Sequence, residues 1–446
     1  MKVAIESHGC RLNQAEGDGL ARLLGEAGHE LVADPADADC FVLNGCTVTH
    51  DADADARKRI RAVHRLRPEA QIVVTGCFAN AHPQLAAELP GVSAVLGNVE
   101  KDELASLLAR PPQGLIHLES LTKKRDGKRP VISAPRMADL PVAGPPKRAR
   151  AYLKVQDGCN YQCSFCIVPQ VRGRSRSVPL ATARAQLREL VAEGRPEVAL
   201  TGVHLGTWGW EMGLRKPGLA GLVEGLLEEV GDSRLRLGSL DPHELSDALV
   251  ALMRQHAPKL CRHLHLPVQS GDDGILAAMR RAHRDADLRK SLPRAVAAID
   301  GVAIGSDIIV GFPGEDEAAF ERSVALFDEL PLHYAHVFTY SPRAGTHAAE
   351  LHERRELRVA PEVARRRNAV LRERVARNWL AFRRGQLGQE LEVMVWRRRH
   401  KKTGKLVGLT DNYIKVQFDG ADALLGRRAR IRLDELDGAC TVGTLV

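Results

Sequence analysis

The chain has 446 residues, of which 44% are hydrophobic and 27% are charged, and its formal net charge is +8. This length suffices for two or three domains with separate cores. Two classes are excluded: membrane-spanning proteins, since no apolar run reaches 18 residues, and disulfide scaffolds, since nine cysteines are too few for this size. The first residues enter a strand-like segment without a signal-like apolar region, so we expect a soluble, cytoplasmic protein.

Strand-like and helix-like segments alternate over about the first 110 residues. The apolar runs VAIESHGC, CFVLNGC and IVVTGC each end in Gly-Cys, and helices are expected at about 14–27 and 52–66. This pattern predicts a doubly wound α/β domain over residues 1–115. Cys10, Cys46 and Cys77 then lie at the carboxyl ends of parallel strands, where ligands collect in open sheets.

A linker is predicted at residues 116–147, because this segment is rich in Pro, Gly, Lys and Arg and has no sustained apolar period. An edge strand within it is an open alternative.

Residues 148–380 contain six strand-like runs separated by helix-like stretches: YLKV, EVALTG, RLRLGSL, RHLHLPV, VAIGSDIIVGF and YAHVFTY. Six β/α units are too few for an eight-stranded barrel, so we predict a partial (β/α)6 barrel with its active-site groups on loops after the strands. A long basic amphipathic helix is expected at 356–385. The short runs that follow predict a small β-barrel over 381–446, whose first hairpin is WRRRHKKTGK.

Cys159, Cys163 and Cys166 form a second triplet in DGCNYQCSFC, spaced so that one loop can wrap a small metal cluster. An iron–sulfur cluster normally takes four thiolates. Three thiolates leave one iron open to hold a substrate by its amine and carboxylate. Zinc is the alternative, but it requires a fourth ligand and none is obvious nearby. The two triplets therefore predict two iron–sulfur clusters, whereas Cys40, Cys261 and Cys440 are expected to be ordinary thiols.

The positive charge is spread over every region and favours nucleic acid as a partner. Aromatic residues make up only 4% of the chain, which leaves few stacking platforms. The basic runs are Lys123 to Arg125, Lys147 to Arg150, Arg172 to Arg176, Arg365 to Arg367 and Arg397 to Lys402.

The C-x3-C-x2-C loop in a β/α domain resembles the radical S-adenosylmethionine (SAM) superfamily. The resemblance implies that Cys159, Cys163 and Cys166 hold a 4Fe-4S cluster whose open iron chelates SAM, which an electron cleaves to a deoxyadenosyl radical. HGCRLNQ, NGCTVTHDAD, VTGCFA and the C-terminal barrel narrow the resemblance to the methylthiotransferases. That family implies a second 4Fe-4S cluster on Cys10, Cys46 and Cys77, and an RNA-binding TRAM domain at the C-terminus.

The same resemblance implies that residues at the strand ends bind SAM, and two positions depart from the family pattern. Asp241 stands where Glu is expected, and His347 stands where Pro is common. The expected cofactor-binding residues are Thr201, Gly202, Gln269, Ser270, Gly311, Gly314 and Glu315.

Methylthiotransferases act on tRNA with isopentenyladenosine, on tRNA with threonylcarbamoyladenosine, or on an aspartate of ribosomal protein S12. RGRSRS after the cysteine loop resembles the threonylcarbamoyladenosine branch. The implied reaction replaces hydrogen at carbon 2 of that nucleoside, beside the anticodon, with a methylthio group, and needs an electron donor and a sulfur source. The other two branches, and a non-catalytic RNA-binding iron–sulfur protein, remain alternatives.

Eight basic residues are candidates for binding the anticodon loop. Ion pairs with acidic neighbours are the alternative for the first three. The candidates are Arg172, Arg174, Arg176, Arg397, Arg398, Arg399, Lys401 and Lys402.

Overall fold

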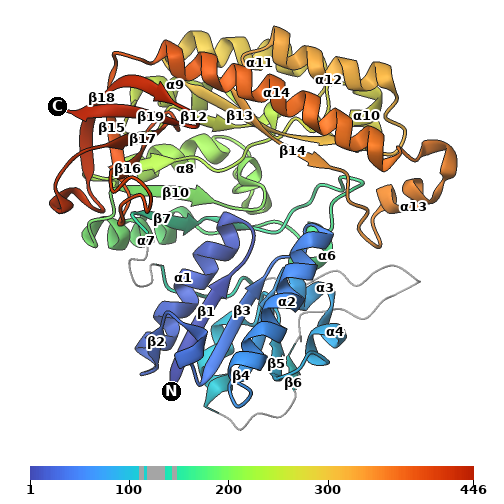
Figure 1. Ribbon diagram of the computed structural model, residues 1–446, viewed down its shortest axis with the longest axis vertical. Helices are drawn as coiled ribbons and strands as arrows, with labels where there is room; N and C mark the ends of the chain where they lie inside the picture. The colour runs from blue at the N-terminus through green and yellow to red at the C-terminus, as the bar shows by residue number, and fades with distance from the viewer. Residues whose placement is uncertain (110–114, 118–135, 143–147) are drawn as a thin grey trace.

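Three structural parts follow one another along the chain in a computed structural model that describes residues 1–109, 115–117, 136–142 and 148–446. An α/β sheet comes first, an open β/α half-barrel second and a small closed barrel last (Figure 1). Most of the predicted linker, including the basic run at Lys123, lies outside the described residues, as does Lys147. Among the described helices, none combines the length and apolarity that a membrane span requires.

The first part is a parallel six-stranded sheet with the strand order β2-β1-β3-β4-β5-β6. Apolar side chains alternate between its two faces and form one core with α2 and another with α1 and α5. The predicted doubly wound domain is thus confirmed, and its last strand lies at the start of the predicted linker. The elements are β1 (Lys2–Ser7), α1 (Arg11–Glu26), β2 (Glu30–Val32), β3 (Cys40–Gly45), α2 (His50–Leu66), β4 (Gln71–Gly76), α3 (Cys77–Ala81), α4 (Pro83–Ala87), β5 (Val92–Leu96), α5 (Leu104–Leu108) and β6 (Leu115–His117).

The second part is a half-barrel built from two parallel three-stranded sheets, β11-β10-β7 and β12-β13-β14. Parallel bridges Leu235↔Leu260 and Ser239↔His265 join β11 to β12, so the six strands form one curved, open sheet. This confirms the predicted partial barrel. Its strands are β7 (Arg150–Lys154), β10 (Glu197–Thr201), β11 (Arg234–Arg236), β12 (His263–His265), β13 (Ala303–Val310) and β14 (Tyr334–Thr339).

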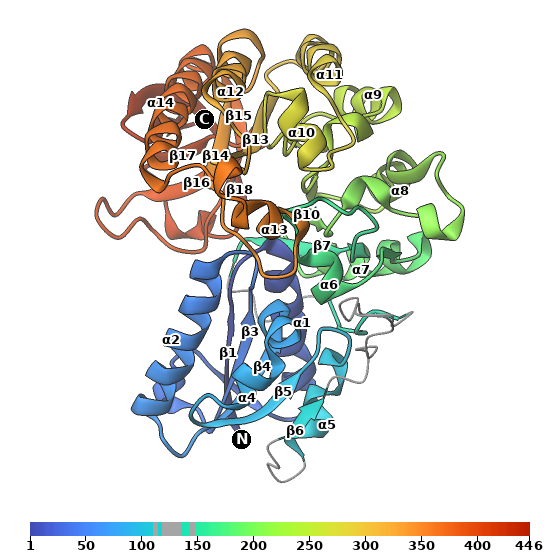
Figure 2. The same ribbon diagram turned by 90° about the vertical axis from the view of Figure 1, so that its right-hand side faces the viewer.

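Helices cover the outside of the half-barrel (Figure 2). A large apolar core fills the space between these helices and the strands. The predicted basic helix is α14, and it packs along β14 through the bond from Asn368 Nδ2 to the Val337 carbonyl, at 3.0 Å. A two-stranded hairpin of β8 (Gln156–Asp157) and β9 (Arg176–Ser177) encloses the cysteine loop. The helices are α6 (Val168–Arg172), α7 (Leu180–Ala192), α8 (Gly218–Leu227), α9 (Asp247–Gln255), α10 (Asp273–Ala278), α11 (Asp285–Ala298), α12 (Glu317–Glu329), α13 (His347–Glu353) and α14 (Pro361–Gly385).

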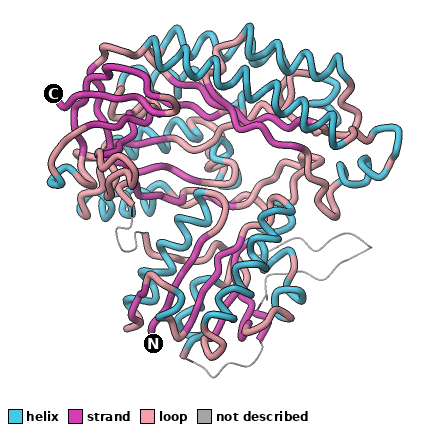
Figure 3. The backbone as a smooth tube through the Cα atoms, viewed as in Figure 1, coloured by secondary structure: helices cyan, strands magenta, loops and turns pink. Residues whose placement is uncertain are grey.

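The third part is a closed barrel with the strand order β15-β16-β17-β19-β18, beside the half-barrel (Figure 3). Buried arginines join the two: Arg234 Nη2 donates to the Leu409 carbonyl at 2.7 Å, and Arg236 Nη1 donates to that of Asp411 at 2.9 Å. Backbone acceptors on the barrel thus fix its position. Its strands are β15 (Glu390–Val395), β16 (Leu406–Thr410), β17 (Lys415–Phe418), β18 (Arg428–Asp437) and β19 (Cys440–Leu445).

Candidate active site

The first cysteine triplet lies at the carboxyl edge of the N-terminal sheet. Cys10 follows β1 and precedes α1, Cys46 follows β3, and Cys77 opens α3 directly after β4. Gly9 adopts a positive φ of 87°, and a Cβ there would lie 2.7 Å from Cys46 Sγ, so glycine permits this approach. Burial, together with the smaller effect of the neighbouring Cys77 and Cys10 thiols, raises the pKa of the Cys46 thiol to about 11. The three thiols therefore gather at one edge, as the Gly-Cys pattern predicts.

The second triplet lies on the loop between β8 and α6. Burial raises the pKa of Cys166 to about 12, and the Cys163 and Cys159 thiols act in the same direction. Two polar groups from other loops contact this triplet. Cys159 Sγ lies 3.5 Å from His204 Nδ1, and Cys163 Sγ lies 3.5 Å from Arg281 Nη1. The sequence analysis missed both, because His204 and Arg281 lie 45 and 118 residues beyond their thiols.

The two triplets are joined through α3 and α6. Cys77 forms a small apolar cluster with Ile167 and Val171, which follow Cys166 in the chain. Asn98 bridges the same two helices, because its Nδ2 atom lies 2.9 Å from the Val171 carbonyl and 3.9 Å from Cys77 Sγ. The helix that leaves one triplet thus packs on a member of the other.

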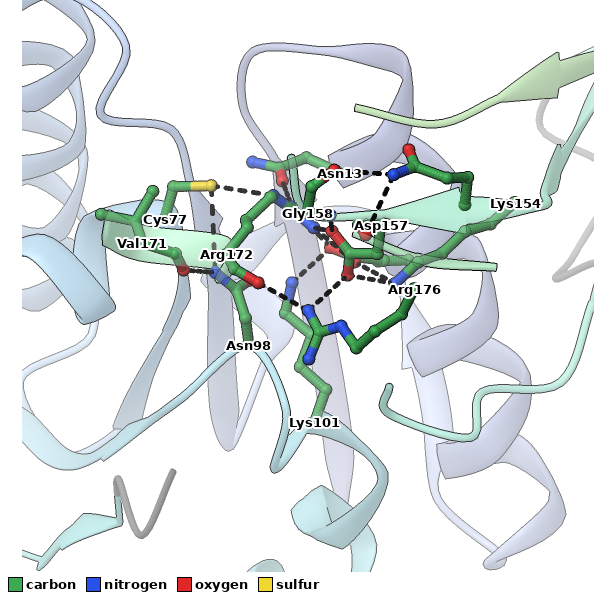
Figure 4. Close-up of polar contacts among 12 residues, drawn as sticks. Asn13, Cys77, Asn98, Lys101, Lys154, Asp157, Gly158, Val171, Arg172 and Arg176 are labelled. Carbon is green, nitrogen blue, oxygen red and sulfur yellow. Dashed lines mark hydrogen bonds and ion pairs between the residues drawn. The ribbon is translucent and has the colours of Figure 1, made fainter. Parts of the chain in front are cut away.

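The prediction that Arg172 and Arg176 bind RNA is wrong, because both side chains are buried. Arg172 is 2% exposed and pairs with Glu16 and Asp157, at 2.9 and 3.0 Å (Figure 4). Arg176 is 9% exposed and donates to the carbonyls of Arg136 and Arg172. The alternative of acidic neighbours therefore holds for Arg172, and side chains committed in this way are not available to phosphates. Of this run, Arg174 alone is exposed.

Two of the expected cofactor residues lie at the end of β10. Thr201 is the last residue of that strand, and its carbonyl accepts the Val155 amide at 3.0 Å. The backbone of Gly202 packs so closely against Gln156 that a Cβ atom on residue 202 would lie 2.9 Å from Gln156 Oε1. Gln156 in turn donates to Ser175 Oγ and accepts the amide of His204, at 2.9 and 2.8 Å. This strand end thus lies next to the loop of Cys159, Cys163 and Cys166, through Gln156 and His204.

Gln269 and Ser270 lie after β12. Gln269 holds an uncommon positive φ of 74°, and its backbone pairs with Asp307 and Ile309 of β13. Ser270 is fully buried and accepts the amide of Asp272 at 3.2 Å. Their backbone geometry therefore shapes the edge of the half-barrel.

Gly311, Gly314 and Glu315 form the turn after β13. The two glycines have φ values of 75° and 88°, which favour glycine. Glu315 Oε2 accepts the Gly311 amide at 2.6 Å and pairs with Arg367 of α14 at 2.8 Å. Glu315 Oε1 is also buried and has no hydrogen-bond partner within the described part of the chain. An unpaired buried acceptor fits a site that receives a ligand with hydrogen-bond donors.

Asp241, where the family pattern led us to expect Glu, is the centre of a polar group. Its Oδ2 lies 2.6 Å from Arg281 Nη2, and its Oδ1 lies 3.0 Å from the Nδ1 atoms of both His243 and His283. These ion pairs lower the pKa of Asp241 against the effect of its burial, which would raise it. His347, the other departure, opens α13 and contacts Glu350 at 3.3 Å.

The donor chemistry of the triplets fits clusters better than single ions. Within the described residues, one group of three potential metal-binding side chains has its ligand atoms within 4.8 Å of one another, namely Asp241, His243 and His283. The sulfur atoms of neither cysteine triplet lie that close together. Zinc at about 2.3 Å from each sulfur would draw thiolates closer than that. The ion pair with Arg281 already balances the charge of Asp241. Three thiolates with a wider separation suit an iron–sulfur cluster with one open iron.

The basic hairpin between β15 and β16 divides into two kinds of residue. Arg398, Lys401 and Lys402 are exposed. Arg399 instead holds the turn, donating to Asp422 Oδ1 and to the carbonyls of Gly404 and Gly420. Arg397 is exposed but donates to the Arg148 carbonyl at 3.3 Å. The hairpin therefore presents three exposed cations beside a structural arginine.

A groove of about 440 Å³ lies between β14 and α14. Its lining includes Tyr334, Phe338, Arg372 and Trp379, and Phe338 is 46% exposed. At the inner end Tyr334 stacks on Tyr413 with ring centroids 5.4 Å apart. The Tyr413 hydroxyl accepts from Arg11, the residue after Cys10, at 3.3 Å. The groove thus combines aromatic rings with a cation and leads toward the first triplet. The sequence analysis missed it, since its two walls are distant in the chain.

Two protein families match this chain. Residues 2–97 match the uncharacterized protein family UPF0004, and residues 153–327 match the radical SAM superfamily. The first match covers the sheet that carries Cys10, Cys46 and Cys77, and the second begins just before the loop of Cys159.

Curated relatives match nearly the whole chain. The threonylcarbamoyladenosine tRNA methylthiotransferase MtaB of Thermotoga maritima is 34% identical over 422 residues, covering 94% of this chain and 91% of the relative. The tRNA-2-methylthio-N(6)-dimethylallyladenosine synthase of Sphingopyxis alaskensis is 35% identical over 435 residues, covering 96% and 94%.

A solved structure matches the fold. The radical S-adenosylmethionine methyltransferase TsrM from Kitasatospora setae superposes with a TM-score of 0.55 at 17% identity, covering 81% of this chain and 79% of TsrM. SAM and 4Fe-4S clusters are the cofactors of the family that these comparisons identify. By its two domain matches and its near full-length relatives, the chain belongs to the radical SAM methylthiotransferase family, in the branch of MtaB.

Proposed function

We propose that this chain replaces the hydrogen at carbon 2 of N6-threonylcarbamoyladenosine, beside the anticodon of a tRNA, with a methylthio group. The observation that carries the proposal is the pair of cysteine triplets, joined through α3 and α6, in a chain of the MtaB branch. The relatives support tRNA as the substrate class, and those named MtaB support the threonylcarbamoyl nucleoside.

Six cysteines would hold the two 4Fe-4S clusters, one on each triplet. When bound, the clusters and SAM supply radical and methyl-transfer chemistry, which a C–H bond requires because no protein base can deprotonate it. The cluster ligands are Cys10, Cys46 and Cys77 for one site and Cys159, Cys163 and Cys166 for the other.

The chain's own groups would orient and shield the radical site. Arg281 and His204 contact the thiols of Cys163 and Cys159 and would orient them. The strand ends at Thr201, Gly202 and Gln269 would receive SAM, and Gly311, Gly314 and Ser270 would shape the surrounding turns. Glu315 has one buried oxygen to offer a donor of the cofactor. Enclosure of this kind excludes water from a reactive intermediate.

The RNA would approach across the half-barrel and the small barrel, which we assign as the TRAM domain. Arg174, Arg397, Arg398, Lys401 and Lys402 are exposed and would neutralise phosphates. The groove of Phe338, Trp379 and Arg372 suits an unstacked base, since single-stranded RNA is recognised by stacking on aromatic rings.

An electron donor and a sulfur source are further partners that the chemistry requires, and we expect the reaction to take place in the cytoplasm. We propose that the chain divides into an N-terminal domain at residues 1–115, a linker at 116–147, a radical SAM core at 148–380 and a TRAM domain at 381–446.

The test is mass-spectrometric analysis of tRNA nucleosides from cells that lack the gene and express the wild type or Cys159→Ala. The wild type should restore 2-methylthio-threonylcarbamoyladenosine, and the variant should leave its unthiolated precursor. If the dimethylallyladenosine product changes instead, the second kind of relative identifies the substrate. If no nucleoside changes, the proposal is wrong and the ribosomal-protein branch becomes the candidate.

A further inference from the structure

Arg172 connects the two cysteine triplets. It is the last residue of α6, which begins two residues after Cys166, and it belongs to the radical-site loop in sequence. Its Nε atom nevertheless donates to Cys77 Sγ of the other triplet, at 3.1 Å (Figure 4). The residue is 2% exposed, so water does not screen this contact.

The guanidinium group of Arg172 is held rigidly. Its Nη1 atom donates to Glu16 Oε1 at 2.9 Å and to Asp157 Oδ1 at 3.0 Å. Its Nη2 atom donates to Glu16 Oε2 at 3.0 Å and to Asn13 Oδ1 at 2.6 Å. With the bond to Cys77, these contacts use all five N–H donors that arginine has. The side chain cannot turn away from the thiol without breaking several buried, charge-assisted bonds.

The charges around Arg172 do not balance without the thiol. Lys101 and Lys154 also pair with Glu16, and Lys154 pairs with Asp157. Three cations, Arg172, Lys101 and Lys154, thus face two carboxylates, Glu16 and Asp157. Arg176, 3.9 Å from Asp157, adds a further cation. A buried excess of positive charge destabilises the fold unless an anion lies beside it. A Cys77 thiolate that ligates a cluster would be such an anion, because its Sγ atom contacts Arg172.

We propose that Arg172 is a positioning residue that orients the Cys77 thiolate and raises the reduction potential of the cluster on Cys10, Cys46 and Cys77. Hydrogen bonds to the sulfurs and the net charge nearby set the potential of an iron–sulfur cluster. A cation that donates to a ligating sulfur favours the reduced form, which carries one more negative charge. The inference rests on the proposed function, because it requires that this triplet holds a cluster.

The test uses full-length protein in which Cys159, Cys163 and Cys166 are replaced by Ala, so that the remaining cluster signal comes from the first triplet. An EPR-monitored redox titration compares this background with added Arg172→Gln, Arg172→Lys or Arg176→Gln. Arg176 is the matched control, since it is a buried arginine of the same network that donates to two backbone carbonyls.

At the midpoint potential of the background, Arg172→Gln should lower the ratio of reduced to oxidised cluster about tenfold, which equals 59 mV for one electron. Arg172→Lys keeps the charge and should give a smaller shift, and Arg176→Gln should stay close to the background. The role of Arg172 is refuted if its Gln variant does not shift the potential, or shifts it no more than Arg176→Gln.

Two further outcomes separate the inference from its premise. If Arg172→Gln does not assemble a cluster, Arg172→Lys carries the comparison, and an unchanged potential in that variant refutes the role. If the background protein binds no iron after reconstitution, the cluster assignment itself is wrong. In that case the proposed function fails and not only the role of Arg172.

Discussion

The Nη1 atom of Arg281 lies 3.5 Å from the Sγ atom of Cys163, although the two residues are 118 positions apart in the chain. Asp241 fixes this geometry, since its carboxylate binds Nη2 of the same guanidinium at 2.6 Å. Asp241 thus orients a group that contacts the triplet of Cys159, Cys163 and Cys166.

Asp241→Asn should reduce SAM cleavage about 10- to 100-fold, the usual cost of losing a group that orients a metal ligand. The amide cannot neutralise Arg281, whose position against Cys163 would then be lost. Asp241→Glu should recover much of the activity, because it keeps a carboxylate that can neutralise Arg281. Asp247→Asn, in an exposed ion pair with Arg294, is the control and should be close to wild type. Formation of 5′-deoxyadenosine by reduced enzyme measures the effect, and equal activities of Asp241→Asn and the control would contradict it.

The two cysteine triplets should have different functions, so that replacing one cysteine from each should abolish different activities. Cys159→Ala should abolish SAM cleavage because it removes a proposed ligand of the cluster that binds SAM. Cys46→Ala should still permit cleavage but stop sulfur insertion. Iron content, 5′-deoxyadenosine and methylthio product are measured together on each variant. Equal loss of both activities in Cys46→Ala, with iron at the second triplet intact, would refute this division of labour.

The hairpin between β15 and β16 should contribute to tRNA binding through its positive charge and not through its shape. Each single replacement by Ala, at Arg398, Lys401 or Lys402, should weaken the salt dependence of tRNA binding. The slope of the logarithm of the binding constant against the logarithm of the salt concentration should fall by about one, as expected for a lost phosphate contact. Arg399→Ala should instead lower the thermal stability of the barrel, because Arg399 holds Asp422 and two carbonyls. Binding titrations at several salt concentrations distinguish the two. An unchanged slope in all three variants would exclude the hairpin from the RNA interface.

Glu197→Gln should destabilise the protein by about 3–5 kcal/mol, the cost of removing one partner from a buried ion pair. Glu197 is fully buried and binds Arg234 and Arg236 at 2.7 and 2.9 Å, and the same arginines hold the small barrel. Denaturant unfolding of apoprotein measures the loss. The control Glu189→Gln removes a half-exposed partner of Arg22 and should cost less than about 1 kcal/mol. Similar losses in both variants would show that the buried pair adds no more stability than the exposed pair.

Glu6 should contribute a pH-dependent part of the stability. Its burial acts to raise the pKa, but hydrogen bonds from His8 and Arg59 outweigh that effect and lower the pKa to about 2 from 4.5. Between these values the unfolded state binds more protons, so this contribution is complete above pH 4.5 and is lost as the pH falls toward 2. Melting temperatures of the apoprotein from pH 6 to pH 3 should fall less steeply for Glu6→Gln. Parallel curves for the two proteins would contradict the assignment.

Local patterns determined much of this protein from the sequence alone. Apolar periodicity marked the strands of the N-terminal sheet and the half-barrel, α14 and the closed barrel, because alternation and helical spacing involve residues a few positions apart. Gly-Cys at three strand ends also placed Cys10, Cys46 and Cys77 at one edge, because parallel strands present their carboxyl ends together.

The tertiary structure alone decided the roles of the charged residues. Arg172 and Arg174 are neighbours in a basic run, yet the first is buried and the second is exposed. The difference arises from Glu16, which lies 156 residues from Arg172 and packs against it only when α1 meets α6. Arg234, Arg236 and Arg281 likewise find their partners across domains or loops. A charge in a sequence does not specify its partner, because pairing between distant residues depends on how the sheets and helices pack.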